Sequence, residues 1–337
     1  MKILVLKRDK VGDMLLTTPM LRVLRQAIPD ARIEVLASDC NAWVLDGNRD
    51  VDRVWVYRRV RLGRRVSATA ALQQLSIFSR LRARRFDVAI AAGGEASARA
   101  TRRARWAGAR RLIAYGQVGE TSGTDLLEEP ATGHERDRML GLLVPLGIDP
   151  NGEAPMPSYT PPAATLAWAQ SWLAREGLVP GRYVVIGLGA RRAKRQPETA
   201  QVLRWSAWLR DAHGLSTVFM WTPGASDDPA YPGDDAIAQP VIDARQRGVH
   251  PFRGPLLEAI GLLWAARASV LPDSGLMHFA AASPGGVVGL FAQPQSSPPP
   301  QRWGPLGGRC VVIVAASRIA AVPDADFISA ISTLVAT

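Results

Sequence analysis

The chain has 337 residues, a formal net charge of +11 and 47% hydrophobic residues, enough to bury the cores of two domains. Its apolar runs are shorter than the roughly 20 residues that cross a bilayer, and charged residues interrupt the first run too early for a secretory signal. We therefore expect a cytoplasmic protein. Residues 1–150 hold 26 Lys and Arg residues against 17 Asp and Glu residues. This basic half attracts phosphates, anionic lipid or nucleic acid, or is only an arginine-rich solvated surface.

Short apolar strands alternate with helical patterns through the first half. The first strand, residues 3–6, is apolar throughout, as in a parallel sheet that is covered on both faces. We expect further strands at 32–37, 54–57, 86–92 and 111–115, and helices at 14–28, 68–82, 96–106 and 134–146. This alternation predicts a doubly wound parallel sheet.

A proline-rich segment, residues 149–162, interrupts the alternation and reads as a linker between domains. A second series of strands and helices follows it. Strands are expected at 183–188, 217–221, 268–271, 287–291 and 311–314, and helices at 165–176, 197–213, 256–266, 276–282 and 324–335. A long polar, proline-rich loop is expected at 293–305. The fold class is therefore α/β, with two Rossmann-like domains facing across a cleft.

The loop after the first strand carries Gly12 and Asp13 at the start of a helix. Open α/β sheets bind ligands at the carboxyl ends of their strands, so this loop is a candidate site. Glycine permits unusual backbone angles or close approach of a ligand. The alternative for Asp13 is a helix cap, because aspartate is favoured at helix N-termini.

Two loops in the second half have the same character. Gly189 and Ala190 follow a strand and precede Lys194, a combination that suits a phosphate. The chain has 37 arginines and four lysines, so a lysine here suggests a site that needs a compact point charge, although an ordinary solvated lysine is the alternative.

The other loop, Asp273-Ser274-Gly275, leads into a helix that contains His278. Its backbone N–H groups, with Ser274 as a cap, could hold a diphosphate. The alternatives are a tight capped turn and a core or capping histidine.

Arginines gather in an expected loop after the third strand: Arg58, Arg59, Arg61, Arg64 and Arg65. They could meet phosphates and carboxylates of a substrate or an anionic membrane face, or form a solvated run.

Taken together, the three loops resemble the heptosyltransferases, glycosyltransferase family 9. In the first loop, the resemblance rests on residues 11–13 together with Thr17-Thr18-Pro19. In the second loop, it rests on Gly189-Ala190 together with Lys194 and Pro197. In the third loop, it rests on residues 272–278 together with residues 280–282. Further matches are Asn48-Arg49-Asp50-Val51-Asp52, His134-Glu135 and Arg302-Trp303-Gly304-Pro305. The resemblance implies a GT-B fold with an acceptor domain at 1–155 and a nucleotide-sugar domain at 156–337, whose terminal helix at 324–335 could return to the first domain.

The resemblance also implies an inverting transfer without metal or other cofactor. It implies Asp13 and Lys194 as catalytic residues. Donor-binding residues would be Gly189, Ala190, Lys194, Asp273, Ser274, Gly275 and His278, and acceptor-binding residues would be Gly12, Thr17, Arg58, Arg61 and Arg64. The expected partners are ADP-heptose and an anionic lipopolysaccharide-core or other glycan, with peripheral contact to the cytoplasmic face of the inner membrane and no nucleic acid.

Two positions depart from the family's pattern. Gln196 stands where an aromatic residue is usual, and Ala292-Gln293-Pro294 stands where Gly-Pro-Thr is favoured. Both lie near the expected nucleotide site and leave the donor open. A GT-B-type nucleotide-sugar epimerase and a nucleotide-sugar-binding protein without transfer activity are the alternatives.

Overall fold

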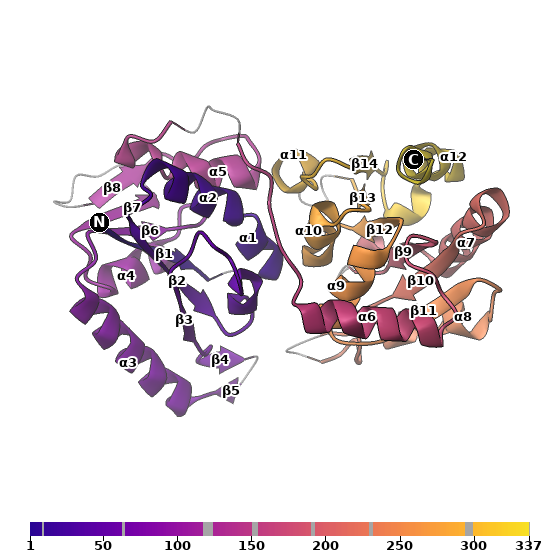
Figure 1. The fold of residues 1–337 in the computed structure, drawn as a ribbon, viewed down its shortest axis with the longest axis horizontal. Coiled ribbons are helices and arrows are strands. Elements are labelled where there is room, and N and C mark those ends of the chain that lie inside the picture. Colours follow the sequence, from indigo (N-terminus) through magenta and orange to yellow (C-terminus); the bar gives the residue numbers. More distant parts are fainter. Residues whose placement is uncertain are drawn as a thin grey trace. The chain divides into compact units, whose positions relative to one another are not determined.

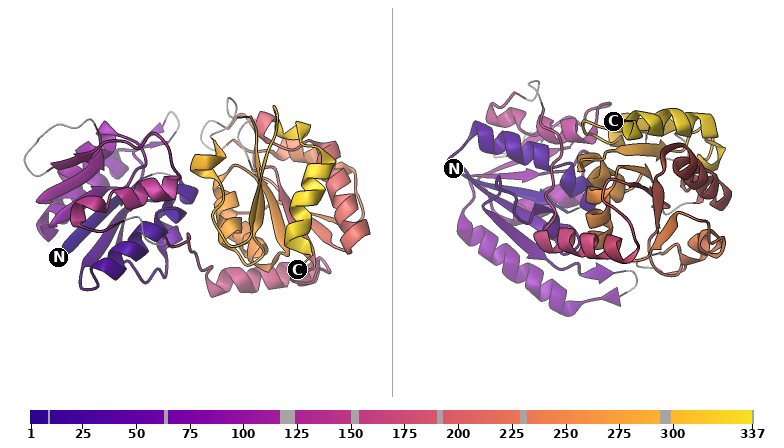
Figure 2. Two further views of the ribbon diagram at one scale, coloured as in Figure 1. Left: turned by 90° about the horizontal axis from the view of Figure 1, so that it is seen from above. Right: turned by 45° about the vertical axis from the view of Figure 1, so that its right-hand side comes forward.

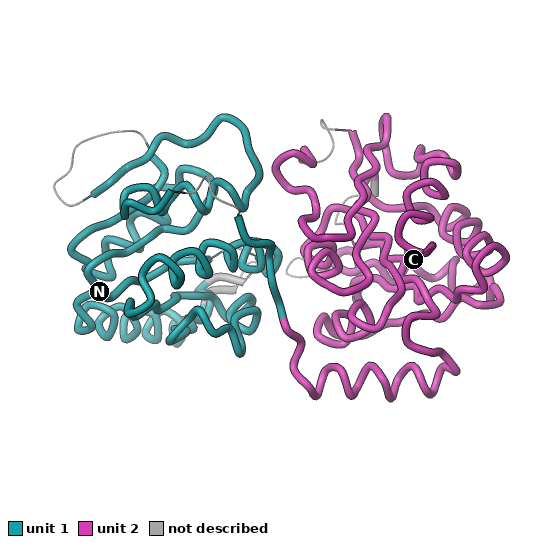
Figure 3. Tube along the Cα trace, turned by 45° about the horizontal axis from the view of Figure 1, so that its top comes forward, with its two compact units in different colours: residues 1–159 teal, residues 160–337 magenta. Residues whose placement is uncertain are grey.

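The structure is a computed structural model that describes residues 1–8, 10–62, 65–116, 124–149, 154–189, 193–228, 232–293 and 299–336. The chain divides into two compact units, Met1–Tyr159 and Thr160–Thr337, each built around its own parallel sheet (Figures 1 and 3). Across the described ranges, no helix combines the length and the apolar character needed to traverse a bilayer.

The first unit contains a six-stranded parallel sheet and a small antiparallel hairpin. Its strands are β1 (Lys2–Lys7), β2 (Arg32–Ser38), β3 (Arg53–Tyr57), β4 (Arg61–Leu62), β5 (Arg65–Val66), β6 (Val88–Ala91), β7 (Arg111–Tyr115) and β8 (Thr124–Leu127). Its α-helices are α1 (Val11–Leu15), α2 (Thr18–Ala27), α3 (Ala68–Arg84), α4 (Ala98–Trp106) and α5 (Glu135–Gly141), with 3-10 turns at Ala42–Leu45 and Val144–Leu146.

The strand order of the first sheet is β3-β2-β1-β6-β7-β8. The chain runs outward from β1 to β3 and then crosses to β6 on the other side of β1. The topological switch point therefore lies between β1 and β6, where open α/β sheets bind ligands. In this unit the loops at that point are the one between β1 and α1 and the one after β6.

Helices cover both faces of the sheet (Figure 2). α3 and α4 pack on one face, where Trp55, Ile77 and Leu81 belong to a buried apolar cluster, while α2 packs with α5. Glu34, on β2, is fully buried and accepts hydrogen bonds from Trp55 Nε1 at 2.6 Å and from the Arg84 guanidinium. Burial raises the pKa of Glu34, but these hydrogen bonds outweigh it and hold the pKa below its ordinary value. The pairing fixes the end of α3 to the sheet.

The second unit repeats the architecture. Its strands are β9 (Tyr183–Gly187), β10 (Ser216–Met220), β11 (Val249–Phe252), β12 (Ala268–Pro272), β13 (Val287–Phe291) and β14 (Cys310–Val314). Its helices are α6 (Ala163–Arg175), α7 (Thr199–His213), α8 (Asp235–Asp243), α9 (Leu256–Ala265), α10 (Gly275–Ala282), α11 (Pro300–Trp303) and α12 (Asp324–Val335), with 3-10 turns at Ala193–Arg195 and Ile319–Ala321.

The strand order of the second sheet is β11-β10-β9-β12-β13-β14, and all its pairings are parallel. Its switch point lies between β9 and β12 by the same reasoning. The loops that follow β9 and β12 therefore start at the same edge of the sheet, next to each other. These are the two loops that carry the predicted nucleotide-sugar residues.

The terminal helix α12 packs within the second unit, against α7, β12, β13 and β14. Phe327, Ile331 and Leu334 are buried in that unit's core, and Phe327 stacks on Trp205 at 4.3 Å between ring centroids. The apolar face of this helix is therefore buried against the sheet of its own unit.

Several elements differ from the sequence predictions. The helix expected at 14–28 is two helices, α1 and α2, and the one expected at 134–146 ends at Gly141 before a 3-10 turn. β8, α8 and β11 were not predicted, and the arginine-rich loop contains the hairpin β4–β5. The loop expected at 293–305 also contains a short helix, α11. α8 carries Pro240 within the helix, and β11 carries Pro251, which obscured their patterns.

Candidate functional site

The two loops at the switch point of the second unit are joined by an ion pair. The Arg195 guanidinium donates to the backbone oxygen of Asp273 at 2.8 Å and also contacts its carboxylate. Both side chains are largely buried, at 17% and 11% exposure. A paired, shielded carboxylate and guanidinium fix the relative position of the two loops more firmly than an exposed pair would.

Gly189 and Ser274 lie in close contact at this point. Gly189 has a φ of +44°, in the left-handed region that glycine adopts without strain, and a Cβ there would lie 3.2 Å from Ser274 Oγ. Ala190 lies outside the described residues. The positive φ therefore favours glycine at position 189, and the adjacent Ser274 leaves little space for a side chain there.

Ser274 occupies the N-cap position of α10, as predicted, but its side chain makes no capping hydrogen bond. Its Oγ is buried and has no hydrogen-bond partner in the part of the chain that the structure describes. Gly275 is the first residue of α10, and His278 is buried one turn later. A helix N-terminus with a buried hydroxyl suits an anionic oxygen, because the N–H groups and the helix dipole favour negative charge.

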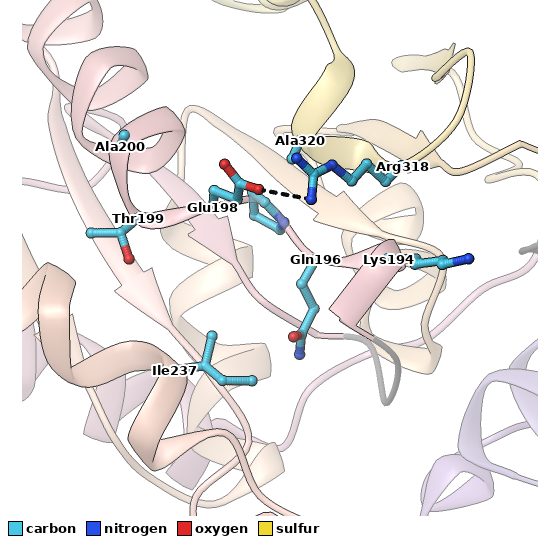
Figure 4. Close-up of a pocket in the computed structure, with 9 residues that line it drawn as sticks. Lys194, Gln196, Glu198, Thr199, Ala200, Ile237, Arg318 and Ala320 are labelled. Carbon is cyan, nitrogen blue, oxygen red and sulfur yellow. Dashed lines mark ion pairs between the residues drawn. The ribbon is translucent and has the colours of Figure 1, made fainter.

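Lys194 lies in the 3-10 turn Ala193–Arg195 and its side chain is exposed. It lines an open depression of about 460 Å³ together with Gln196, Glu198 and Arg318. Figure 4 shows Lys194 directed away from the Glu198–Arg318 ion pair, whose atoms are 3.4 Å apart. The ammonium group of Lys194 therefore lies near the loop after β9 and is directed away from the Glu198 carboxylate.

Gln196, the departure from the family's pattern, is buried and donates from Nε2 to Asp234 Oδ1 at 2.8 Å. Burial raises the pKa of Asp234, and the hydrogen bonds from Gln196 and Thr222 only partly oppose this rise. The pair ties the Lys194 segment to the loop before α8. Where the family usually has an aromatic residue, this chain thus has an amide that donates a hydrogen bond to a carboxyl group.

In the first unit, Asp13 lies in the first turn of α1 and is partly exposed. Its carboxylate accepts a hydrogen bond from the Lys10 backbone N–H at 2.9 Å, so the capping role predicted as the alternative is present. Thr17 is buried, and its hydroxyl donates to the Asp13 carbonyl oxygen at 2.8 Å. Gly12 lies within the helix with no positive φ. Asp13 is thus held at the start of α1 by its contact with the Lys10 backbone.

The loop after β6 is held by a buried polar network that the sequence did not reveal. The Gly94 N–H donates to Glu135 Oε1 at 3.0 Å, and Arg138 Nη1 donates to the Gly94 carbonyl at 2.5 Å. Arg138 also reaches Glu129 and the Pro130 carbonyl, and its own carbonyl accepts from Tyr115. Burial raises the pKa of Tyr115 to about 12, so this hydroxyl remains a donor at neutral pH. These hydrogen bonds fix the loop after β6, one of the two loops at the switch point of the first sheet.

Gly94 has no room for a side chain, because a Cβ there would overlap the Glu135 carboxylate. We expect Gly94→Ala to lower the free energy of unfolding by about 1–3 kcal/mol, measured by urea denaturation. Gly93→Ala is the matched control, since the nearest atom to its Cβ would be the Glu95 carbonyl oxygen at an ordinary 3.5 Å. Equal stabilities for the two variants would contradict the described packing.

The arginines predicted to bind the acceptor lie in and around the hairpin β4–β5. Arg58 is exposed after β3, Arg61 lies in β4 and Arg64 lies outside the described residues. Arg59 pairs with Asp39 at 3.0 Å. Within the described ranges, no three His, Cys, Asp or Glu side chains are grouped so that they could hold a metal ion.

Comparison with known proteins identifies the class. Each unit is a Rossmann-like domain, and the chain has the GT-B fold of nucleotide-sugar-dependent glycosyltransferases. The model of glycosyltransferase family 9 (heptosyltransferase) matches residues 147–325, so the chain belongs to this family of enzymes.

Solved structures agree on the fold at low sequence identity. The glycosyltransferase family 9 protein of Veillonella parvula superposes with a TM-score of 0.80 at 18% identity, covering 99% of this chain and 97% of that one. Escherichia coli ADP-heptose lipopolysaccharide heptosyltransferase II gives 0.73 at 18% identity, covering 100% and 99%. Escherichia coli heptosyltransferase WaaC, solved with ADP, gives 0.69 at 19% identity, covering 98% and 99%. No curated protein sequence matches the chain.

Proposed function

We propose that the protein transfers a heptose from ADP-heptose to a lipopolysaccharide-core or other anionic glycan, with inversion at the anomeric carbon and without a metal ion. The observation that carries the proposal is that Arg195 and Asp273 join the loops after β9 and β12, beside a buried Ser274 hydroxyl that has no hydrogen-bond partner among the described residues. This arrangement at a switch point suits a nucleotide diphosphate. Structures of WaaC with ADP and with a fluorinated ADP-heptose support the choice of donor.

In the proposed reaction, the acceptor hydroxyl oxygen forms a bond to the anomeric carbon as the bond from that carbon to the diphosphate oxygen breaks. Asp13 accepts the hydroxyl proton, and ADP leaves with the bonding electron pair. A single displacement inverts the anomeric configuration. Removal of the proton and stabilisation of the leaving anion are the two needs of this step.

The leaving diphosphate gains negative charge as its bond to the sugar breaks. Lys194, which carries a compact positive charge, and the N-terminus of α10 are the groups proposed to stabilise it. Asp273, Ser274, Gly275, His278, Gly189 and Ala190 are proposed to bind the rest of the donor. The proposal requires Asp13 and this donor site to meet in the reacting complex.

The acceptor side of the proposal rests on the basic first unit. Gly12, Thr17, Arg58, Arg61 and Arg64 are proposed to contact an anionic glycan, and peripheral contact with the inner membrane would bring a glycolipid acceptor within reach. Among the members of this set whose side chains the structure describes, Arg58 is exposed, which supports such a contact.

Calorimetric titration tests the choice of donor. ADP-heptose, ADP-glucose and UDP-N-acetylglucosamine are compared on the same preparation, and we expect ADP-heptose to bind most tightly. Tighter binding of a uridine diphosphate sugar would refute the donor assignment and would make Gln196 and Ala292-Gln293 the first positions to examine.

A further inference from the structure

The outer surface of α3 carries two leucines that the fold does not bury. Ala70, Ile77 and Leu81 face the sheet and are buried. Leu72 and Leu75, three residues apart on the opposite side, are 66% and 68% exposed. Two adjacent large apolar side chains exposed to this degree are unlike the scattered apolar residues of an ordinary surface.

α4 extends this surface with basic and aromatic side chains. Arg99, Arg102 and Trp106 follow the spacing of one helix face, and Trp106 is 51% exposed. The Arg102 guanidinium lies 5.8 Å from the centre of the Trp106 ring. The face of α4 is therefore both cationic and apolar.

Contacts between the two helices make their outer surfaces continuous. The rings of Phe78 and Trp106 meet edge to face with centroids 5.7 Å apart, and Arg82 Nη1 donates to the Trp106 carbonyl at 3.4 Å. Both helices lie on the same side of the first unit (Figure 1). We call the six outward residues of this surface the α3–α4 face: Leu72, Leu75, Arg82, Arg99, Arg102 and Trp106.

The charge on these helices has one sign. α3 carries three arginines and α4 carries four, and neither helix contains an aspartate or glutamate. Serine caps begin both helices, with Ser67 accepting from the Ala70 N–H at 3.2 Å and Ser97 from the Ala100 N–H at 3.3 Å. The face is thus positively charged and also carries exposed leucine and tryptophan side chains.

We propose that the α3–α4 face binds an anionic lipid bilayer. Arginines on such a surface meet lipid phosphates, while leucine and tryptophan side chains enter the region between headgroups and acyl chains. The proposal names the surface that would make the membrane contact included in the proposed function. Its biological role rests on that proposed function. The test uses lipid alone, so a failure of lipid binding and a failure of sugar transfer are distinguished.

Vesicle co-sedimentation of the full chain tests the proposal. We expect binding to phosphatidylglycerol–phosphatidylcholine vesicles to be at least about tenfold tighter than to pure phosphatidylcholine, and to weaken with added salt. Arg99→Gln with Arg102→Gln, and separately Leu72→Ser with Leu75→Ser, should each weaken it about tenfold or more. These residues are exposed, so melting temperatures should stay near that of the parent.

The control is a matched pair of exposed residues in the second unit, Arg175→Gln with Val179→Ser, which should bind vesicles as the parent does. Equal loss in this control, or parent-like binding by both α3–α4 variants, would overturn the proposal. Failure of the parent protein to bind anionic vesicles would also overturn the proposal. Binding to an RNA oligonucleotide that depends on the arginines but not on the leucines, without vesicle binding, would assign the face to nucleic acid instead.

Discussion

Asp13→Asn should lose about 10²–10⁴-fold in turnover while the fold and donor binding stay intact. Asparagine cannot take the acceptor proton, but its side-chain oxygen can still accept the hydrogen bond that the Lys10 N–H gives to Asp13 at 2.9 Å. The cap at the start of α1 is therefore retained and the base is removed. A transfer assay, a thermal melt and a donor titration on one preparation measure all three properties.

Asp30→Asn is the control for this prediction, since Asp30 is an exposed aspartate in the turn before β2. It should transfer sugar at the parent rate. Asp13→Asn with near-parent turnover would reduce Asp13 to a cap, and the base would have to be another residue. A large fall in melting temperature would mean that asparagine does not retain the cap, whose loss is expected to cost roughly 1 kcal/mol.

Lys194→Ala should cost about 10²-fold or more in turnover, because the compact charge proposed to stabilise the leaving diphosphate is lost. Lys194→Arg should recover only part of this loss, since a planar guanidinium is larger and differently hydrated than an ammonium group. Steady-state kinetics with saturating acceptor separate the effect on turnover from the effect on donor affinity.

Arg318→Gln supplies the comparison for Lys194. Arg318 lines the same depression, but its guanidinium is paired with Glu198. Removing it also takes one positive charge from this surface, and we expect near-parent turnover. If Lys194→Ala and Arg318→Gln have the same kinetics, Lys194 is an ordinary solvated lysine without a role in turnover.

The prediction of two doubly wound sheets is confirmed, and its success has a physical basis. Strands such as β1 and β9 are buried on both faces, so their apolar runs are visible without any partner. The loop that carries Asp13 follows a strand of the first sheet. The loops that carry Gly189 and Ser274 follow two neighbouring strands of the second sheet, so the switch-point rule predicts that these two share one edge of that sheet.

Other features have no local signature. The Arg195–Asp273 pair joins residues 78 positions apart, and the Gly94–Glu135 bond joins residues 41 apart, so no pattern within one element indicates either. His134-Glu135 was noticed as a family match, yet the burial of Glu135 against Gly94 depends on tertiary packing. The packing of the terminal helix α12 has no local signature either, because an apolar helix face does not show which sheet covers it.

The most direct test of the account is to incubate the protein with ADP-heptose, with and without a panel of truncated lipopolysaccharide-core glycolipids, and to follow ADP and heptose by mass spectrometry. The account predicts ADP release that depends on one of these acceptors and matches the addition of one heptose to it, with an anomeric configuration opposite to that of the donor. Release of ADP and sugar without acceptor would indicate an epimerase-type or hydrolytic reaction. Donor that binds and is recovered unchanged with every acceptor would contradict transfer altogether.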